Sequence, residues 1–230
     1  MKRFCTLLKN EVKLSIRDMN MVIFALIMPL AVLVVLGILY GRRPAFEGAA
    51  YSFMAQSFGA VCAISICAGG LMGLPLVVSD YRERRILKHF RVTPASPALL
   101  LLAAVAMPAW GVRLGGSLPA FLGAWALTMF STLSIGLMVG ALAKNNKQAG
   151  VIASVLYFPM LVFSGTTLPV EVMPAAMQRI VALFPLTQGI TLMKQTFLGL
   201  GTQGAMTPVA VMALVTVVCT GLAVRFFRWE

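Results

Sequence analysis

Charged residues are scarce in this chain, and acidic residues are the scarcest of all. Charged side chains make up 11% of the 230 residues, and hydrophobic ones make up 60%. A soluble domain carries about 25% charged and about 45–50% apolar residues. The composition therefore excludes an ordinary soluble enzyme, a disordered tail and a fibrous protein, and it predicts a polytopic membrane protein.

The sequence motifs that support enzyme chemistry are missing. No lysine follows a glycine, which excludes a phosphate-binding P-loop, and neither HExxH nor GxSxG occurs. The one histidine, His89, lies in a basic stretch, where a solvated role is the simpler interpretation. The cysteines have neither metal-ligand nor paired spacing, so we interpret Cys5, Cys62, Cys67 and Cys219 as small buried hydrophobic residues. We expect no catalytic residue, no metal and no cofactor bound by this chain.

Groups that could relay ions across a membrane are also absent from the apolar segments. The acidic residues all fall between those segments, at Glu11, Asp18, Glu47, Asp80, Glu83, Glu171 and Glu230. A proton or sodium relay needs ionisable groups inside the membrane, so the pattern argues against an ion-coupled transporter and an intramembrane enzyme. The segments do carry hydroxyls, including Thr128, Ser131, Thr132 and Ser134. Such hydroxyls most often bond to their own helix or a neighbouring one, and lining a permeation path is the alternative.

The apolar segments predict an all-α protein with about six transmembrane helices in a single domain, residues 1–230. Each span needs roughly 20 residues. Five segments qualify, at 21–40, 53–79, 119–143, 149–164 and 206–224. A sixth, 98–110, would cover only about 20 Å as a helix, against about 30 Å of hydrocarbon. Whether it crosses stays open at this stage.

Basic residues predict the orientation of these spans. With six spans and the N-terminus inside, 14 Lys or Arg residues are cytoplasmic and 5 are outside. If 98–110 does not cross, the counts become 13 and 6. The first arrangement fits the positive-inside tendency better, and it places the protein in the plasma (inner) membrane with both termini cytoplasmic. The net charge of +12 thus needs no nucleic-acid partner.

Two basic stretches lie outside the spans. Residues 1–20, with Lys9, Glu11 and Arg17, predict an interfacial helix on the inner leaflet. In residues 80–97, Asp80 is expected to cap a new helix that stops before Pro94. Glu83 shares the apolar face of this helix with Leu87 and Phe90, which favours docking on another protein. An ordinary solvated loop is the alternative.

Residues 165–205 are long and apolar for a loop. Pro169, Pro174 and Pro185 divide the segment, and two short helices are expected at about 173–183 and 187–198. They are too short to cross the membrane, so we expect an outer hairpin that re-enters the membrane or caps the mouth of the protein.

These pieces, in this order, resemble the permease subunits of type 2 ATP-binding-cassette exporters, the ABC-2 membrane family. Three stretches carry the resemblance. They are the basic helix before the first span; Arg82-Glu83, Leu87 and Arg91-Val92-Thr93-Pro94; and Phe163-Ser164-Gly165, Leu168-Pro169, Met173-Pro174, Met177-Gln178 and Phe184-Pro185-Leu186-Thr187.

The resemblance implies a permease that works with a separate ATP-binding cassette ATPase subunit. ATP and Mg would bind that partner, and a second permease copy would complete a homodimer or heterodimer in the lipid bilayer. By the resemblance, Arg82, Glu83, Leu87, Phe90 and Arg91 couple the permease to the ATPase, and Gly165, Pro169, Pro174, Pro185 and Thr187 belong to the outer re-entrant hairpin. Chargeless spans suit export of a lipophilic drug or antibiotic, a lipid or a lipid-linked molecule.

The sequence departs from the family pattern at two places. Arg85 stands where the family commonly has a small residue, and the third span is shorter than usual before the exit Gly111-Val112-Arg113-Leu114. The short span motivates an alternative function, a non-transporting or degenerate membrane assembly or regulatory protein. A passive channel is a weaker hypothesis because no ring of pore-lining charge is visible.

Overall fold

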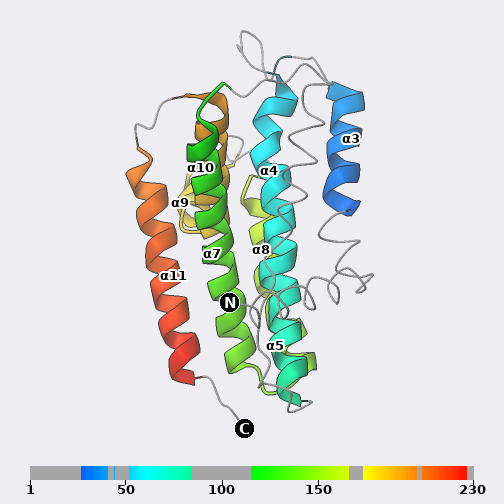
Figure 1. Ribbon diagram of the computed structural model, residues 1–230, viewed down its shortest axis with the longest axis vertical. Helices are drawn as coiled ribbons and strands as arrows, with labels where there is room; N and C mark the ends of the chain where they lie inside the picture. Colours follow the sequence, from blue (N-terminus) through cyan, green and yellow to red (C-terminus); the bar gives the residue numbers. More distant parts are fainter. Residues whose placement is uncertain are drawn as a thin grey trace, which may run out of the picture.

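A computed structural model describes residues 27–40, 44, 52–83, 115–165, 173–200 and 204–226. These parts of the chain form helices, most of which run side by side along one long axis, and one isolated bridge pairs Pro44 with Ser52 (Figure 1). The helices are α3 (Met28–Tyr40), α4 (Phe53–Cys67), the π-helical turn η2 (Ala68–Gly73), α5 (Leu74–Glu83), α7 (Leu118–Leu142), α8 (Asn146–Phe163), α9 (Ala175–Val181), α10 (Pro185–Leu198) and α11 (Met206–Phe226). The predicted interfacial helix and the short segment 98–110 lie outside the described residues.

Long apolar helices confirm the expected class of protein. Among the described residues, three helical stretches are long and apolar enough to cross a membrane: Phe53–Asp80, Leu118–Leu142 and Met206–Phe226. The stretch Pro29–Tyr40 is apolar but shorter. Large apolar side chains face outward on α11 and α8, for example Val217 and Val155, as expected for surfaces in contact with lipid.

Local signals set the starts of α7 and α8, and α8 begins at Asn146, three residues before its predicted apolar segment. Pro119 lies in the first turn of α7, a position where its missing N–H costs nothing. Between the two helices, the Asn145 side chain accepts a hydrogen bond from the backbone N–H of Gln148 (2.8 Å). The Gln148 side chain accepts one from the N–H of Lys144 (3.0 Å). These two bonds satisfy N–H groups that a helix start leaves free.

The second apolar segment forms one helical rod, although the sequence suggests an interruption at its glycines. The rod runs from α4 through η2 into α5, and Asp80 lies inside α5. The prediction that Asp80 caps a new helix is therefore wrong. The helix continues because Leu74 and Val78 are buried in the bundle. Their packing holds α5 in place, so the helix runs on through Asp80 to Glu83.

Two neighbouring helical rods run in the same direction. Phe58 of α4 stacks on Phe121 of α7 with ring centroids 5.6 Å apart, and further along both rods Val78 meets Gly140. Both rods therefore start at the upper end of Figure 1 and finish at the lower end. Glu83, the last residue of the first rod, lies at the lower end, and Gly115, just before the second rod, lies at the upper end.

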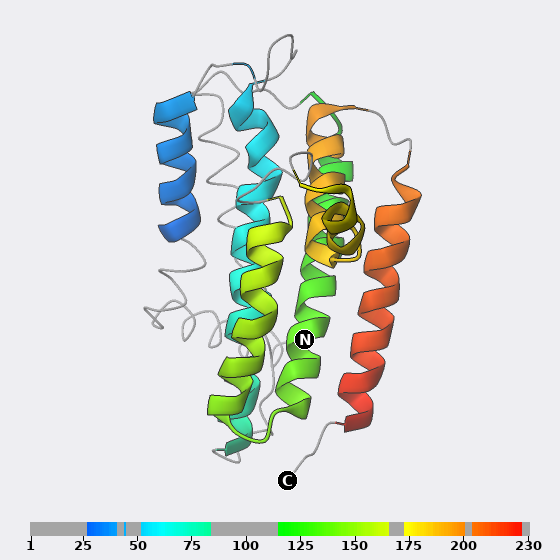
Figure 2. The same cartoon turned by 180° about the vertical axis from the view of Figure 1, so that it is seen from behind.

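Helix α7 lies at the centre of the packing and contacts α4, η2, α5, α8, α10 and α11. Helix α8 runs antiparallel to α5, with Gly150 beside Leu76 and the Ser154 hydroxyl 3.9 Å from the Met72 sulfur. Helix α10 fills only the upper half of the space next to α7 (Figure 2). The core is apolar and tightly packed, and Met193, Met212 and Phe58 are almost fully buried.

Candidate functional site

Helix α5, which forms the lower arm of the bundle (the α5 arm), carries the first part of the predicted coupling segment. Arg82 and Glu83 are the last two residues of α5. Leu87, Phe90 and Arg91 lie outside the described residues, as do the interfacial-helix residues Lys9, Glu11 and Arg17.

Close contacts hold this arm in place. A Cβ built on Gly140 would meet the Val78 side chain at 2.8 Å, and one on Gly150 would meet Leu76 at 3.5 Å. Helix α5 thus packs against α7 and α8 through glycines, so its backbone lies close to theirs. Helix α5, which ends at the predicted coupling residues Arg82 and Glu83, is thus positioned directly by the central helix.

The predicted hairpin residues lie at the turns between α8, α9 and α10. Gly165 follows α8 with a φ of 90°, a left-handed conformation that glycine adopts without strain. Pro174 is the N-cap residue of α9, and Pro185 is the first residue of α10. Thr187 lies in the first turn of α10 and is buried, with its hydroxyl unpartnered. Pro169 lies outside the described residues.

Side-chain hydrogen bonds stabilise these turns. The Gln178 amide donates to the backbone carbonyl of Met173 (2.8 Å), and the Gln188 amide donates to that of Ala182. Both glutamines bond to carbonyls across a turn. They supply partners that backbone groups at helix ends otherwise lack.

Helix α10 is fixed against α4 and α7 by aromatic rings and close backbone contacts. The rings of Phe58, Phe121 and Phe197 form one cluster, with the Phe58 and Phe197 centroids 4.8 Å apart. The backbone N–H groups of Gly115 and Gly116 both donate to the Phe197 carbonyl at 3.1 Å. These contacts join the C-terminal end of α10 to the residues before α7, so the upper end of the bundle is firmly tied.

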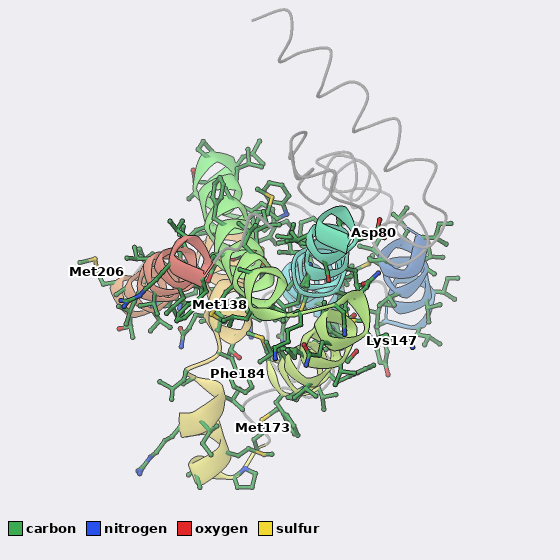
Figure 3. All side chains as sticks on the ribbon, turned by 90° about the horizontal axis from the view of Figure 1, so that it is seen from below. Asp80, Met138, Lys147, Met173, Phe184 and Met206 are labelled. Carbon is green, nitrogen blue, oxygen red and sulfur yellow. The ribbon has the colours of Figure 1, made fainter. Side chains whose placement is uncertain are left out.

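The start of α10 lies near mid-height in the bundle. A Cβ built on Gly189 would meet the Thr128 side chain at 2.4 Å. Thr128 is ten residues into α7, or about 15 Å below its upper end, and Pro185 lies about one further turn, roughly 5 Å, lower. Helix α9 precedes this point and projects outward from the bundle (Figures 2 and 3). On α9, Arg179 and Ile180 are exposed, and Val181 is buried.

One basic residue lies deeper than its sequence position suggests. The charge count places Lys194 on the outer side, within the helix predicted at about 187–198, and Lys194 does lie within α10, where it is half-buried. Its backbone nitrogen would lie 3.4 Å from a Cβ on Gly59 of α4. Lys194 is this deep because α10 packs alongside the rods rather than beyond their ends.

The hydroxyls of α7 mostly bond to their own helix, which confirms the simpler of the two interpretations. Thr128 donates to the Ala124 carbonyl (2.7 Å), Thr132 to the Thr128 carbonyl (3.0 Å) and Ser134 to the Ser131 carbonyl (2.7 Å). The buried Ser131 hydroxyl has no partner in the structure. The hydroxyls of Thr128, Thr132 and Ser134 are therefore satisfied by backbone carbonyls of α7 itself.

The described part of the chain offers structure rather than reactive chemistry. Cys62, Cys67 and Cys219 are free thiols and are buried, as predicted. Within the described ranges, no group of three His, Cys, Asp or Glu residues could hold a metal ion. The two notable features of the arrangement are helix α5, which ends at Glu83, and helix α10, which begins near mid-height in the bundle.

Sequence reasoning missed the π-helical turn and the aromatic cluster. The signal for the turn is the glycine spacing Gly69, Gly70 and Gly73, which suggests close packing without revealing its partner. The signal for the cluster is weaker still, because Phe58, Phe121 and Phe197 are far apart in sequence.

Comparison with known proteins gives one family and several relatives. The profile of a family described as "ABC-2 type transporter" matches residues 2–198. The "Inner membrane transport permease YhhJ" of Escherichia coli K12 is 29% identical over 157 residues, covering 59% of this chain and 41% of that protein. "Nodulation protein J" of Rhizobium leguminosarum bv. viciae is 36% identical over 74 residues, covering 32% of this chain and 29% of that protein. The matches thus span about two fifths or less of these relatives.

Proposed function

The chain belongs to the ABC-2 type transporter family, and from this we propose that it is the membrane-spanning permease subunit of an ATP-driven exporter. The family consists of non-catalytic membrane subunits, and the ATPase is a separate component. ATP and Mg would therefore bind the partner ATPase. The observation that carries the proposal is the family match over residues 2–198, which contains all three stretches that resemble the family.

Six crossings of the inner membrane account best for the helix directions. The rod from α4 to α5 and helix α7 both run downward (Figure 1), so one more crossing between them is needed in a membrane. This supports a crossing within 84–114, and with it the arrangement that places 14 basic residues inside and 5 outside. The lower end then faces the cytoplasm, and both termini lie on that side. The E. coli relative is named as an inner membrane permease, which supports the same location.

A second permease copy, identical or different, completes the transporter. Helix α9 supports this, because it leaves the bundle near the middle of the membrane with Arg179 exposed. An arginine at the centre of a bilayer costs about 2.5–3.5 kcal/mol on insertion scales. Irregular backbone at that depth needs surrounding protein or a water-filled cavity. A second copy facing α9 would shield Arg179 from lipid and surround the irregular backbone with protein. The hairpin of α9 and α10 then re-enters the membrane from the outer side.

The cargo is a lipophilic molecule such as a drug or antibiotic, a lipid or a lipid-linked compound. Support comes from the bundle interior, which is lined by apolar side chains and self-bonded hydroxyls. The path for such a cargo lies between two permease copies rather than through one tightly packed bundle.

The coupling residues provide the test of this function. We expect the double variant Glu83→Ala/Phe90→Ala to insert normally and to lose ATP-driven transport, because its docking helix loses one charge and one apolar anchor. The measurement is translocation of a fluorescent phospholipid and of a lipophilic dye in vesicles that contain the permease and its ATPase. The control Val224→Ala/Arg225→Ala changes one apolar and one charged residue that are exposed at the lower end of α11, and it should transport normally. Full transport by the Glu83/Phe90 variant would argue against the proposed coupling.

The alternative function is a non-transporting assembly or regulatory protein derived from a permease. The short segment 98–110 motivates it. A label at Gly115 distinguishes the two functions: labelling from outside supports the exporter, and labelling from the cytoplasmic side supports the alternative.

A further inference from the structure

The rod formed by α4 and α5 changes its helical winding near its middle. At η2, Ala68–Gly73, the backbone N–H of Leu74 donates to the Gly69 carbonyl. This bond spans five residues, whereas an α-helix spans four. A π-helical turn therefore holds one extra residue, and such turns occur often at functional sites. Three of its six residues are glycines, and Pro75 is the second residue after it.

Near this turn, the rod packs against α7 through glycines and small side chains. A Cβ on Gly136 of α7 would lie 2.0 Å from the Gly70 carbonyl oxygen, so the two backbones touch without side chains between them. One turn lower on α7, the Val78 side chain rests directly on Gly140. A contact of backbone and small side chains lacks the interlocking side chains that hold most helix pairs in register.

The two sides of the turn have different anchors. Above it, α4 is fixed through Phe58 to the ring cluster with Phe121 and Phe197. Below it, α5 ends at Arg82 and Glu83, the start of the proposed coupling segment. A change in winding at η2 would therefore move the coupling residues while the upper half of the bundle stays in place.

We propose that η2 is a hinge that switches between its π-helical form and an ordinary α-helical form and so moves α5 relative to α4. The use of this movement in transport rests on the proposed exporter function. In the α-helical form the extra residue is absorbed into the helix, so every residue of α5 advances by about 1.5 Å and rotates by about 100°. Hinges and helix shifts of this kind are established elements of conformational switching.

The sequence of α5 suits such a switch. When α5 advances by one residue, the position held by Val78 against Gly140 is taken by Val77. The two side chains are identical, so the contact with Gly140 is remade with the same volume. The alternative form therefore needs no new cavity at this contact.

Cysteine crosslinking distinguishes the two forms. The pair Val78→Cys/Gly140→Cys reports the form described here, and Val77→Cys/Gly140→Cys reports the advanced form. In a Cys5→Ser background in native membranes, we expect both pairs to crosslink. The control pair Val77→Cys/Gly123→Cys should not crosslink, because Gly123 lies about 25 Å from Gly140 along α7. A 77/140 pair that crosslinks no more than this control would overturn the hinge.

Deleting Gly73 provides a second test. The deletion removes the extra residue, so α5 keeps its contacts while the π-helical turn disappears. Crosslinking of the 77/140 pair should then fall about tenfold or more, and that of the 78/140 pair should persist. The control Gly73→Ala also removes the glycine but keeps the number of residues, so it should retain both crosslinks. Equal crosslinking by the 77/140 pair in both variants would contradict the proposal, and so would loss of that crosslink in both.

A transport measurement separates the hinge from the exporter function. In vesicles that contain the ATPase, the oxidised 78/140 pair should stop movement of a fluorescent phospholipid, and reduction should restore it. If the unmodified permease moves no phospholipid, the proposed function fails for this cargo, and the crosslinks still decide the hinge. Transport at the full rate with the 78/140 pair oxidised would show that the hinge is not needed. If the deletion variant does not fold, the full-length 77/140 pair decides alone.

Discussion

Replacement of Gly136 by alanine tests the central packing contact most sharply. The new Cβ would lie 2.0 Å from the Gly70 carbonyl oxygen, whereas ordinary van der Waals contact starts at 3.4 Å. The two rods must therefore separate by about 1.4 Å at this point, and a backbone carbonyl cannot rotate away as a side chain can. Overpacking costs about 1–3 kcal/mol, and we expect the upper part of that range because both partners are backbone.

The assay is thermal unfolding of the purified chain in mild detergent, followed by size-exclusion chromatography. For a chain of this size, about 2–3 kcal/mol lowers the Tm by roughly 5–10 °C. The matched control is Gly123→Ala on the same helix, where an added Cβ has no atom within 4 Å. That variant should be as stable as the parent or slightly more so, because alanine favours the helix by up to about 1 kcal/mol. Equal Tm values for the two variants would refute the contact between Gly70 and Gly136.

Two further predictions concern α10 and α9. Gly189→Ala should destabilise the protein because its Cβ would lie 2.4 Å from the Thr128 side chain, and Thr128→Ala should rescue it. A double-mutant cycle in Tm should show coupling of at least about 1 kcal/mol. Additive effects would contradict the contact. Ile180→Cys on α9, in a Cys5→Ser background, should form a crosslinked dimer in membranes if a second permease copy covers α9. Val224→Cys on α11 is the control because both positions are well exposed (61% and 75%), and equal crosslinking at the two positions would argue against an interface at α9.

The parts of the fold that follow local signals could be predicted from the sequence. The apolar run 119–143 lies between Ser117 and Lys144, and α7 spans Leu118–Leu142 accordingly. The prolines at 174 and 185 mark the starts of α9 and α10. Proline fixes its own φ and lacks an N–H, so it sets a helix start without help from distant residues.

The parts that depend on contacts between distant segments could not be predicted. Whether a helix starts at Asp80 or passes through it depends on the burial of Val78 against Gly140, residues that are far apart in sequence. The π-helical turn likewise depends on the approach of Gly136 to Gly70. The depth of Lys194 could not be predicted either, because the sequence does not show that α10 packs beside α4. The roles of Leu87, Phe90 and Arg91 stay predictions, because they lie outside the described residues.

Affinity purification after light crosslinking tests the central claim most directly. The tagged chain would be isolated in mild detergent from its native membrane, and crosslinked peptides would be identified by mass spectrometry. We expect a soluble ATP-binding cassette ATPase to co-purify, with crosslinks to the segment from Arg82 to Arg91. Recovery of the folded chain without any ATPase would contradict the exporter function and favour a non-transporting membrane protein.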